Sequence, residues 1–157
     1  MSREVITTSI LLIASVVAVS VVIMTMIPSI RDLSNSYTSV SVKLNEKVTT
    51  DIEIIFVKAS PSDDSKVKVT LWVKNTGRTL NLALVEKSDL FISSSLDFVH
   101  LTLKDCFYSI ENGDGDEYWE RGETLKVVTG DLAISRGEYE VTLVLYNGVK
   151  ATDYFSW

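Results

Sequence analysis

One acidic segment has residue types and a spacing that could bind a metal ion. Residues 112–123 place side-chain oxygens at alternate positions and end on a glutamate eleven residues after the first oxygen-bearing side chain. This is the spacing of an EF-hand loop, which surrounds Ca²⁺ with oxygen ligands. The weak candidate ligands are Asn112, Asp114, Asp116 and Glu123.

The match to a calcium loop is incomplete. Glu117 occupies the position where an EF-hand turns sharply on glycine, and Asn112 stands in place of the usual first aspartate. Strand-like rather than helical sequence flanks the loop. We therefore expect a hairpin turn kept soluble by its carboxylates, with no metal site and no need for calcium in folding.

The remaining reactive side chains are isolated from one another. His100 is the single histidine and alternates with apolar neighbours, so we expect it at a sheet surface rather than as a base or ligand. Cys106 is the single cysteine, which excludes an intramolecular disulfide and favours a buried thiol. The sequence has no nucleophile elbow, Cys–His pair or phosphate-binding loop. It predicts no enzyme activity, no cofactor and no small-molecule substrate.

The elements that carry these residues begin with a long uncharged segment. Every residue from Val5 to Ile27 is uncharged, and most are aliphatic. A helix needs roughly 20 such residues to cross a bilayer, and it satisfies its own backbone there. The run is longer than the apolar part of a secretory signal and ends without a small-residue cleavage pattern, so it predicts a retained single-pass membrane anchor. Arg3 weakly favours an outside C-terminal domain.

An amphipathic continuation follows Pro28. Five apolar side chains recur at spacings of three and four residues: Ile30, Leu33, Tyr37, Val40 and Leu44. This seam predicts that the helix leaves the membrane and reaches about Leu44. Serines and β-branched residues form poor isolated helices, so the seam needs a packing partner. The partner is either the chain's own C-terminal domain or the same helix of neighbouring subunits.

From Asp51 onward the apolar period is two. Residues 66–74 alternate, which places valines and a leucine on one face and lysines with Trp72 on the other. Trp72 either covers lysine stems or contacts a partner. Other strands are expected over 52–58, 90–93, 98–103, 107–110, 124–129, 139–146 and 151–157. Residues 60–64 are expected to be a loop, and Asn147-Gly148 to form a type I′ hairpin turn.

Seven or eight short strands at this spacing indicate an all-β antiparallel sandwich, immunoglobulin-like in architecture. The predicted domains are 1–46, a membrane-spanning helix with an amphipathic extension, and 47–157, the β-sandwich. The formal net charge of −6 argues against nucleic acid or anionic lipid as the main partner.

Several short stretches follow the anchor and its extension in a fixed order: residues 72–77, 88–91, 119–125, 137–141 and 147–149. Together with the anchor they resemble the archaellum (archaeal flagellum) accessory proteins FlaF and FlaG, which are related to archaellins. The order and spacing of the stretches are more similar to FlaG than to FlaF.

The resemblance implies a pilin-like helix followed by a β-sandwich that lies between the membrane and the S-layer. It also implies a stator of the archaellum motor that is not an enzyme, works with a FlaF-like partner and forms a homo-oligomer or short filament. The alternatives are a filament-forming archaellin or pilin subunit and the FlaF-type S-layer-binding partner. Only Ser2, Arg3 and Glu4 separate Met1 from the apolar segment, without the basic residue and glycine that precede it in processed archaellins. This difference favours a retained anchor.

Overall fold

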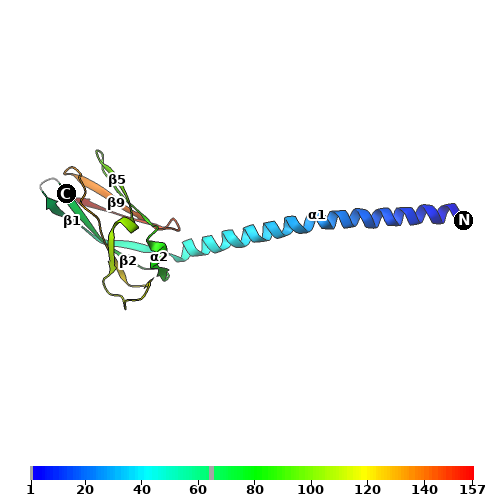
Figure 1. The fold of residues 1–157 in the computed structure, drawn as a ribbon, viewed down its shortest axis with the longest axis horizontal. Coiled ribbons are helices and arrows are strands. Elements are labelled where there is room, and N and C mark those ends of the chain that lie inside the picture. The colour runs from blue at the N-terminus through cyan, green and yellow to red at the C-terminus, as the bar shows by residue number, and fades with distance from the viewer. Residues whose placement is uncertain (1, 64–65) are drawn as a thin grey trace. The chain divides into compact units, whose positions relative to one another are not determined.

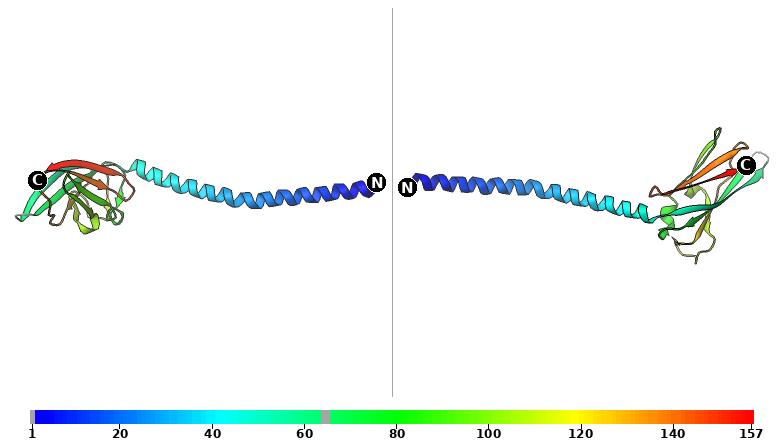
Figure 2. Two further views of the ribbon diagram at one scale, coloured as in Figure 1. Left: turned by 90° about the horizontal axis from the view of Figure 1, so that it is seen from above. Right: turned by 180° about the vertical axis from the view of Figure 1, so that it is seen from behind.

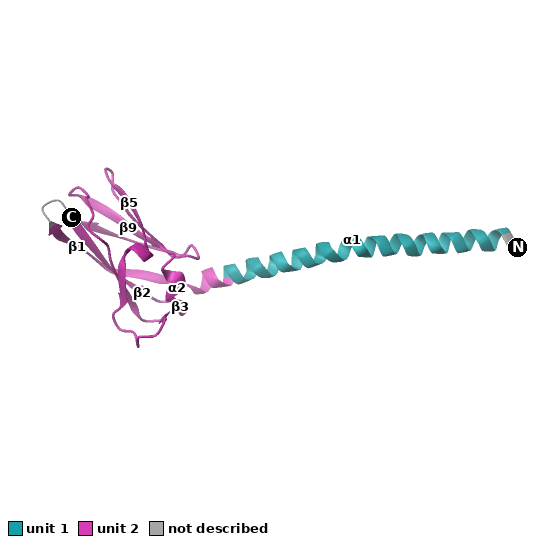
Figure 3. Cartoon of the chain, in the orientation of Figure 1, with its two compact units in different colours: residues 1–44 teal, residues 45–157 magenta. Residues whose placement is uncertain are grey.

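The computed structural model describes residues 2–63 and 66–157. The chain divides into two compact units, Met1–Leu44 and Asn45–Trp157 (Figure 3). The first unit is helical. The second contains the last turn of that helix and all the strands (Figure 1).

Helix α1 spans Ser2–Thr49 and contains Pro28. It therefore extends past the predicted end near Leu44. Its hydroxyl side chains donate to carbonyls of the preceding turn, as Ser9 does to Val5 at 2.8 Å and Ser20 does to Val16 at 2.8 Å. Such bonds satisfy polar side chains within the helix itself, which an apolar solvent requires.

The second unit contains two antiparallel four-stranded sheets, which confirms the predicted fold class (Figure 2). The first sheet has the order β1 (Ile52–Asp63), β2 (Lys66–Asn75), β8 (Thr124–Val128) and β6 (Phe107–Ile110). The second has the order β10 (Lys150–Ser156), β9 (Glu138–Val144), β4 (Asp89–Ser93) and β5 (Phe98–Thr102). A small ladder joins β3 (Leu80–Asn81) to β7 (Tyr118–Trp119), and two short helical turns, α2 (Leu82–Val85) and η1 (Leu103–Asp105), complete the unit.

One hydrophobic core lies between the two large sheets. The inward side chains of β2, beginning at Val67, are fully buried, as the alternating pattern predicts. Leu90 and Leu143 line the core from the second sheet, and Trp119 is buried at one end. Burial of these side chains provides the main drive for folding of the unit.

Two local predictions were wrong. Residues 60–63 belong to β1 rather than to a loop, because β1 is an edge strand where the missing N–H of Pro61 costs no ladder bond. Residue 64, the end of that expected loop, lies outside the described residues.

The hairpin at Asn147-Gly148 exists, but its turn is not type I′. Of these two residues only Gly148 has positive φ, at 78°. The Gly148 N–H donates to the Leu145 carbonyl at 2.8 Å, and the Leu145 N–H donates to the Val149 carbonyl at 2.8 Å. This pattern is a type I turn followed by a glycine bulge, so only one position needs the left-handed conformation.

Candidate membrane and assembly surfaces

The apolar segment of α1 presents side chains on every side of the helix. The large aliphatic side chains from Val5 to Ile27 are exposed, and the least accessible of them, Ile27, is 43% accessible. The helix is long and apolar enough to cross a membrane, with a mean hydropathy of 2.9 in its most apolar window. A helix that is apolar around its whole circumference is suited to lipid rather than to water.

The seam side chains beyond Pro28 are exposed on the helix. Ile30, Leu33, Tyr37, Val40 and Leu44 have accessibilities of 57%, 71%, 76%, 56% and 56%. Their three-and-four spacing on a continuous helix places them along one narrow stripe. The stripe is thus available for packing against another helix.

The last turn of α1 is bound to loops of the β-unit. Glu46 Oε1 accepts a hydrogen bond from the Tyr146 hydroxyl at 2.8 Å and forms an ion pair with Arg78 at 3.4 Å. Thr50 Oγ1 accepts a bond from Asn147 Nδ2 at 2.9 Å, and the Arg78 N–H donates to the Thr49 carbonyl at 3.0 Å. We call these six residues, of which Thr49 takes part through its carbonyl only, the helix-end junction.

Two residues next to the helix-end junction, Asn75 and Gly77, support it. Asn75 is fully buried, and its Nδ2 donates to the carbonyls of Arg78 and Trp119, both at 2.8 Å. A Cβ on Gly77 would lie 2.3 Å from the Asp51 backbone nitrogen, so only glycine allows this approach. The stretches 72–77 and 119–125, singled out above as separate motifs, therefore meet in space.

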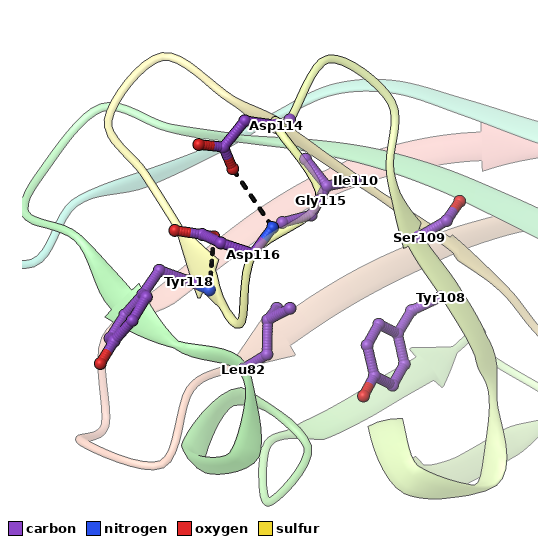
Figure 4. A pocket seen from close by; sticks show the side chains of 9 residues that line it. Leu82, Tyr108, Ser109, Ile110, Asp114, Gly115, Asp116 and Tyr118 are labelled. Carbon is purple, nitrogen blue, oxygen red and sulfur yellow. Dashed lines mark hydrogen bonds between the residues drawn. The ribbon is translucent and has the colours of Figure 1, made fainter.

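The acidic loop uses its side chains to hold its own backbone (Figure 4). Asp114 Oδ1 accepts from the Asp116 N–H at 3.2 Å, and Asp116 Oδ1 accepts from the Tyr118 N–H at 2.8 Å. Asn112 Oδ1 accepts from the Thr124 N–H at 2.7 Å, while Glu123 is buried and accepts from the Glu120 N–H at 2.7 Å. Within the described residues, no three His, Cys, Asp or Glu side chains are grouped as a metal site.

A pocket of about 230 Å³ lies beside this loop, between Leu82, Tyr108, Ile110 and Tyr118 (Figure 4). The Tyr108 hydroxyl donates to Glu86. Burial, and to a smaller extent this hydrogen bond, raise the pKa of Tyr108 to about 12. The phenol therefore stays protonated and acts as a donor that links β6 to the end of α2. Asp114 and Asp116, which also line the pocket, accept the backbone bonds of the loop described above.

Trp72 lies on the outer face of the first sheet, opposite the buried valines, as predicted. Its ring centroid is 5.4 Å from that of Phe56 and 5.5 Å from Lys126 Nζ. Both neighbours cover part of the indole and leave it half-buried. The tryptophan thus packs on its own sheet and still presents area to the outside.

The other candidate residues have structural positions. His100 Nε2 lies 2.8 Å from Asp89 Oδ1 on the exposed face of β5 and β4, and its ring stacks on Phe91. Cys106 is buried. Its burial, and to a smaller extent the negative charge of Asp105, raise the pKa of its thiol. A raised pKa keeps the thiol protonated and unreactive.

Sequence reasoning missed the helix-end junction. Its contacts join residues about a hundred positions apart, such as Glu46 and Tyr146, and no local pattern encodes such a pair. The only available signal was the position of Glu46 near the end of a helical pattern.

Comparison with known proteins decides the family. A family model described as archaeal-type flagellin matches residues 2–155. The chain belongs to the archaeal-type flagellin family. An uncharacterized protein of Archaeoglobus fulgidus is 58% identical to this flagellin-family chain over 163 residues, which is 100% of each chain.

Solved structures show the fold of this member of the family. The archaellum periplasmic stator protein FlaG from Sulfolobus acidocaldarius is similar with a TM-score of 0.50 and 14% identity, covering 68% of this chain and 99% of FlaG. A FlaF and FlaG stator complex from the same organism gives a TM-score of 0.48 and 14% identity, covering 66% of this chain and 87% of that one. The fold is thus FlaG-like, and the chain is an archaellum-related protein.

Proposed function

We propose that the chain is a stator element of the archaellum motor, anchored in the cell membrane by Val5 to Ile27. Its C-terminal β-unit lies outside the membrane, below the S-layer, and its subunits associate through the exposed seam. The observation that carries the proposal is one continuous helix that supplies an apolar span and then an unpaired apolar stripe, before it ends on a β-unit of FlaG-like fold.

The seam makes association through neighbouring helices the favoured arrangement. Five apolar side chains exposed to water are costly, and their burial against equivalent side chains removes that cost. A filament or oligomer built this way gives the motor a fixed element that is held in the membrane at one end. A FlaF-like protein is the proposed partner that links this element to the S-layer.

Cysteine cross-linking tests the seam. Tyr37→Cys should give disulfide-linked dimers in membranes under mild oxidation, since equivalent seam positions face each other. Asn35→Cys, placed away from the seam, is the matched control. Equal cross-linking of both variants would reject the seam as an interface.

Motility measurements test the stator role. Deletion of the gene should leave cells without filaments or with filaments that do not rotate, and the Leu33→Gln/Val40→Gln variant should not restore swimming. Val42→Gln, which lies outside the seam, should restore it. Normal swimming of the deletion strain would contradict the role.

A main filament subunit is the second candidate, because the family also takes its description from flagellin. It requires removal of the segment before the apolar helix and high abundance in shed filaments. Intact-mass measurement of the protein from membranes and from shed filaments separates the two functions: a full-length mass confined to membranes supports the stator.

A further inference from the structure

The outer face of the first sheet is basic, in a chain with a net charge of −6. Cross-strand pairing places the outward side chains of β1, β2 and β8 in rows on this surface. Among the strand residues whose side chains the structure describes, five lysines and one glutamate point outward there: Lys58, Lys66, Lys68, Lys74, Lys126 and Glu53. We call this surface the basic face. Two carboxylates from outside these strands partly neutralise the face. Lys68 Nζ lies 3.6 Å from Asp131 Oδ1, and Lys126 Nζ lies 2.8 Å from Glu111 Oε1.

An aromatic patch, Phe56 with Trp72, lies on the basic face, and Phe107 lies on the edge strand β6 of the same sheet. Phe56 pairs with Trp72 across β1 and β2, and Val128 pairs with Phe107 across β8 and β6. Phe56 is 55% exposed and Phe107 is 77% exposed. Apolar area of this kind surrounded by charge is typical of an interface rather than of a free surface.

The outer face of the second sheet has the opposite sign. Asp89, Glu138 and Glu140 point outward from β4 and β9. Among the described residues of these four strands, Lys150 is the one lysine or arginine, and His100 lies against Asp89. This surface, the acidic face, also has an aromatic patch. It consists of Phe91, Phe98 at 69% exposure and Tyr154 at 71% exposure.

We propose that the basic face of one β-unit docks on the acidic face of a second copy of the chain. The aromatic patches would bury each other, while lysines meet carboxylates around them. Pairing of two basic faces would instead juxtapose lysines, which is unfavourable. This contact adds a second interface to the assembly proposed above, and it rests on that proposed function.

The contact is heterologous, because each copy uses two different surfaces. Each added copy leaves one basic and one acidic face free at the ends, so association continues into a stack. The β-units thereby supply a second line of contacts besides the helix seam.

A charge exchange tests the contact. The full chain in detergent micelles is followed by sedimentation velocity over a concentration series. Lys58→Glu/Lys74→Glu makes both faces acidic, and Glu138→Lys/Glu140→Lys makes both basic. Each variant alone should need about tenfold or more protein to half-associate, since like charges then meet. An equimolar mixture of the two should associate within about threefold of the unchanged chain, because unlike faces are available again.

Matched controls change the same charge away from both faces. Lys87→Glu/Lys104→Glu and Glu117→Lys/Glu120→Lys should associate as the unchanged chain does. Face variants that behave like these controls, a mixture that fails to associate, or stronger association of the lysine-to-glutamate variant alone would each overturn the proposal. If a charge-reversal variant fails to fold by circular dichroism, the milder pairs Lys58→Gln/Lys74→Gln and Glu138→Gln/Glu140→Gln replace it, and unchanged association of both would overturn the proposal. Loss of Tyr37→Cys cross-linking with intact face docking would reject the seam alone, so the two failures are distinguishable.

Discussion

Gly77 shows how closely single residues determine the end of the helix. Its N–H and that of Thr76 both donate to the Asp51 carbonyl at 3.0 Å, so the chain leaving α1 is in contact with the turn after β2. Asn75 binds the other side of this turn. The small residue and the buried amide together hold the start of the β-unit against its core.

Gly77→Ala should lower the free energy of unfolding by about 3 kcal/mol, since the new methyl group would overlap the Asp51 backbone. Gly137→Ala is the control, because a Cβ there meets no atom within 4 Å. It should change stability by less than about 1 kcal/mol. Urea unfolding followed by circular dichroism measures both, and equal effects would contradict the close approach.

Tyr146 makes the junction sensitive to alkaline pH. Burial of the Tyr146 hydroxyl, and to a smaller extent its hydrogen bond to Glu46, raise its pKa from 10.0 to about 12. A raised pKa in the folded state means that the stabilisation is complete below pH 10 and is lost as pH rises toward 12. Tyr146→Phe should reduce this loss of stability over that interval.

The measurement compares free energies of unfolding of the two proteins across this pH interval. Tyr154→Phe serves as the control, because Tyr154 is 71% exposed. An identical pH dependence of Tyr146→Phe and the unchanged chain would show that the junction hydroxyl does not contribute.

At the scale of elements, the periodicity of apolar residues predicted those strands and buried faces that depend on local sequence. Alternation over 66–74 located β2 and assigned its buried face, because inward positions must be apolar. The short helix α2 was missed, since a four-residue turn has no period and depends on Asn81 capping the Ala83 N–H at 2.9 Å. Strand order and the helix-end junction were beyond prediction because they depend on contacts between distant parts of the chain.

The acidic loop between β6 and β8 should be stable without a metal ion. Asp114, Asp116 and Asn112 already accept backbone bonds that fix its shape. Adding millimolar calcium to chelator-treated protein should therefore leave Tm essentially unchanged. A large rise in Tm that is absent from the Asp114→Asn/Asp116→Asn variant would identify a calcium site and contradict this expectation.

At the scale of the whole molecule, the apolar part of α1 should determine where the protein resides. The full chain should stay in the membrane fraction after washing at high salt and should be released by detergent. Val16→Asp/Val19→Asp places two charges within the span, at about 3 kcal/mol each, and should move protein to the soluble fraction. Val42→Asp/Val48→Asp, outside the span, should not. Retention of both variants would indicate attachment by other means.

The positions of the tryptophans have a spectroscopic consequence. Trp119 is inaccessible, and its indole N–H donates to the Glu123 carbonyl at 3.1 Å, so its fluorescence should be blue-shifted and protected from a soluble quencher. Trp72 lies half-buried at the outer surface beside Phe56. Of the three tryptophans, Trp119 is therefore a natural reporter of folding and Trp72 one of surface contact. Once the third is removed by Trp157→Phe, quenching can read the two separately without an added dye.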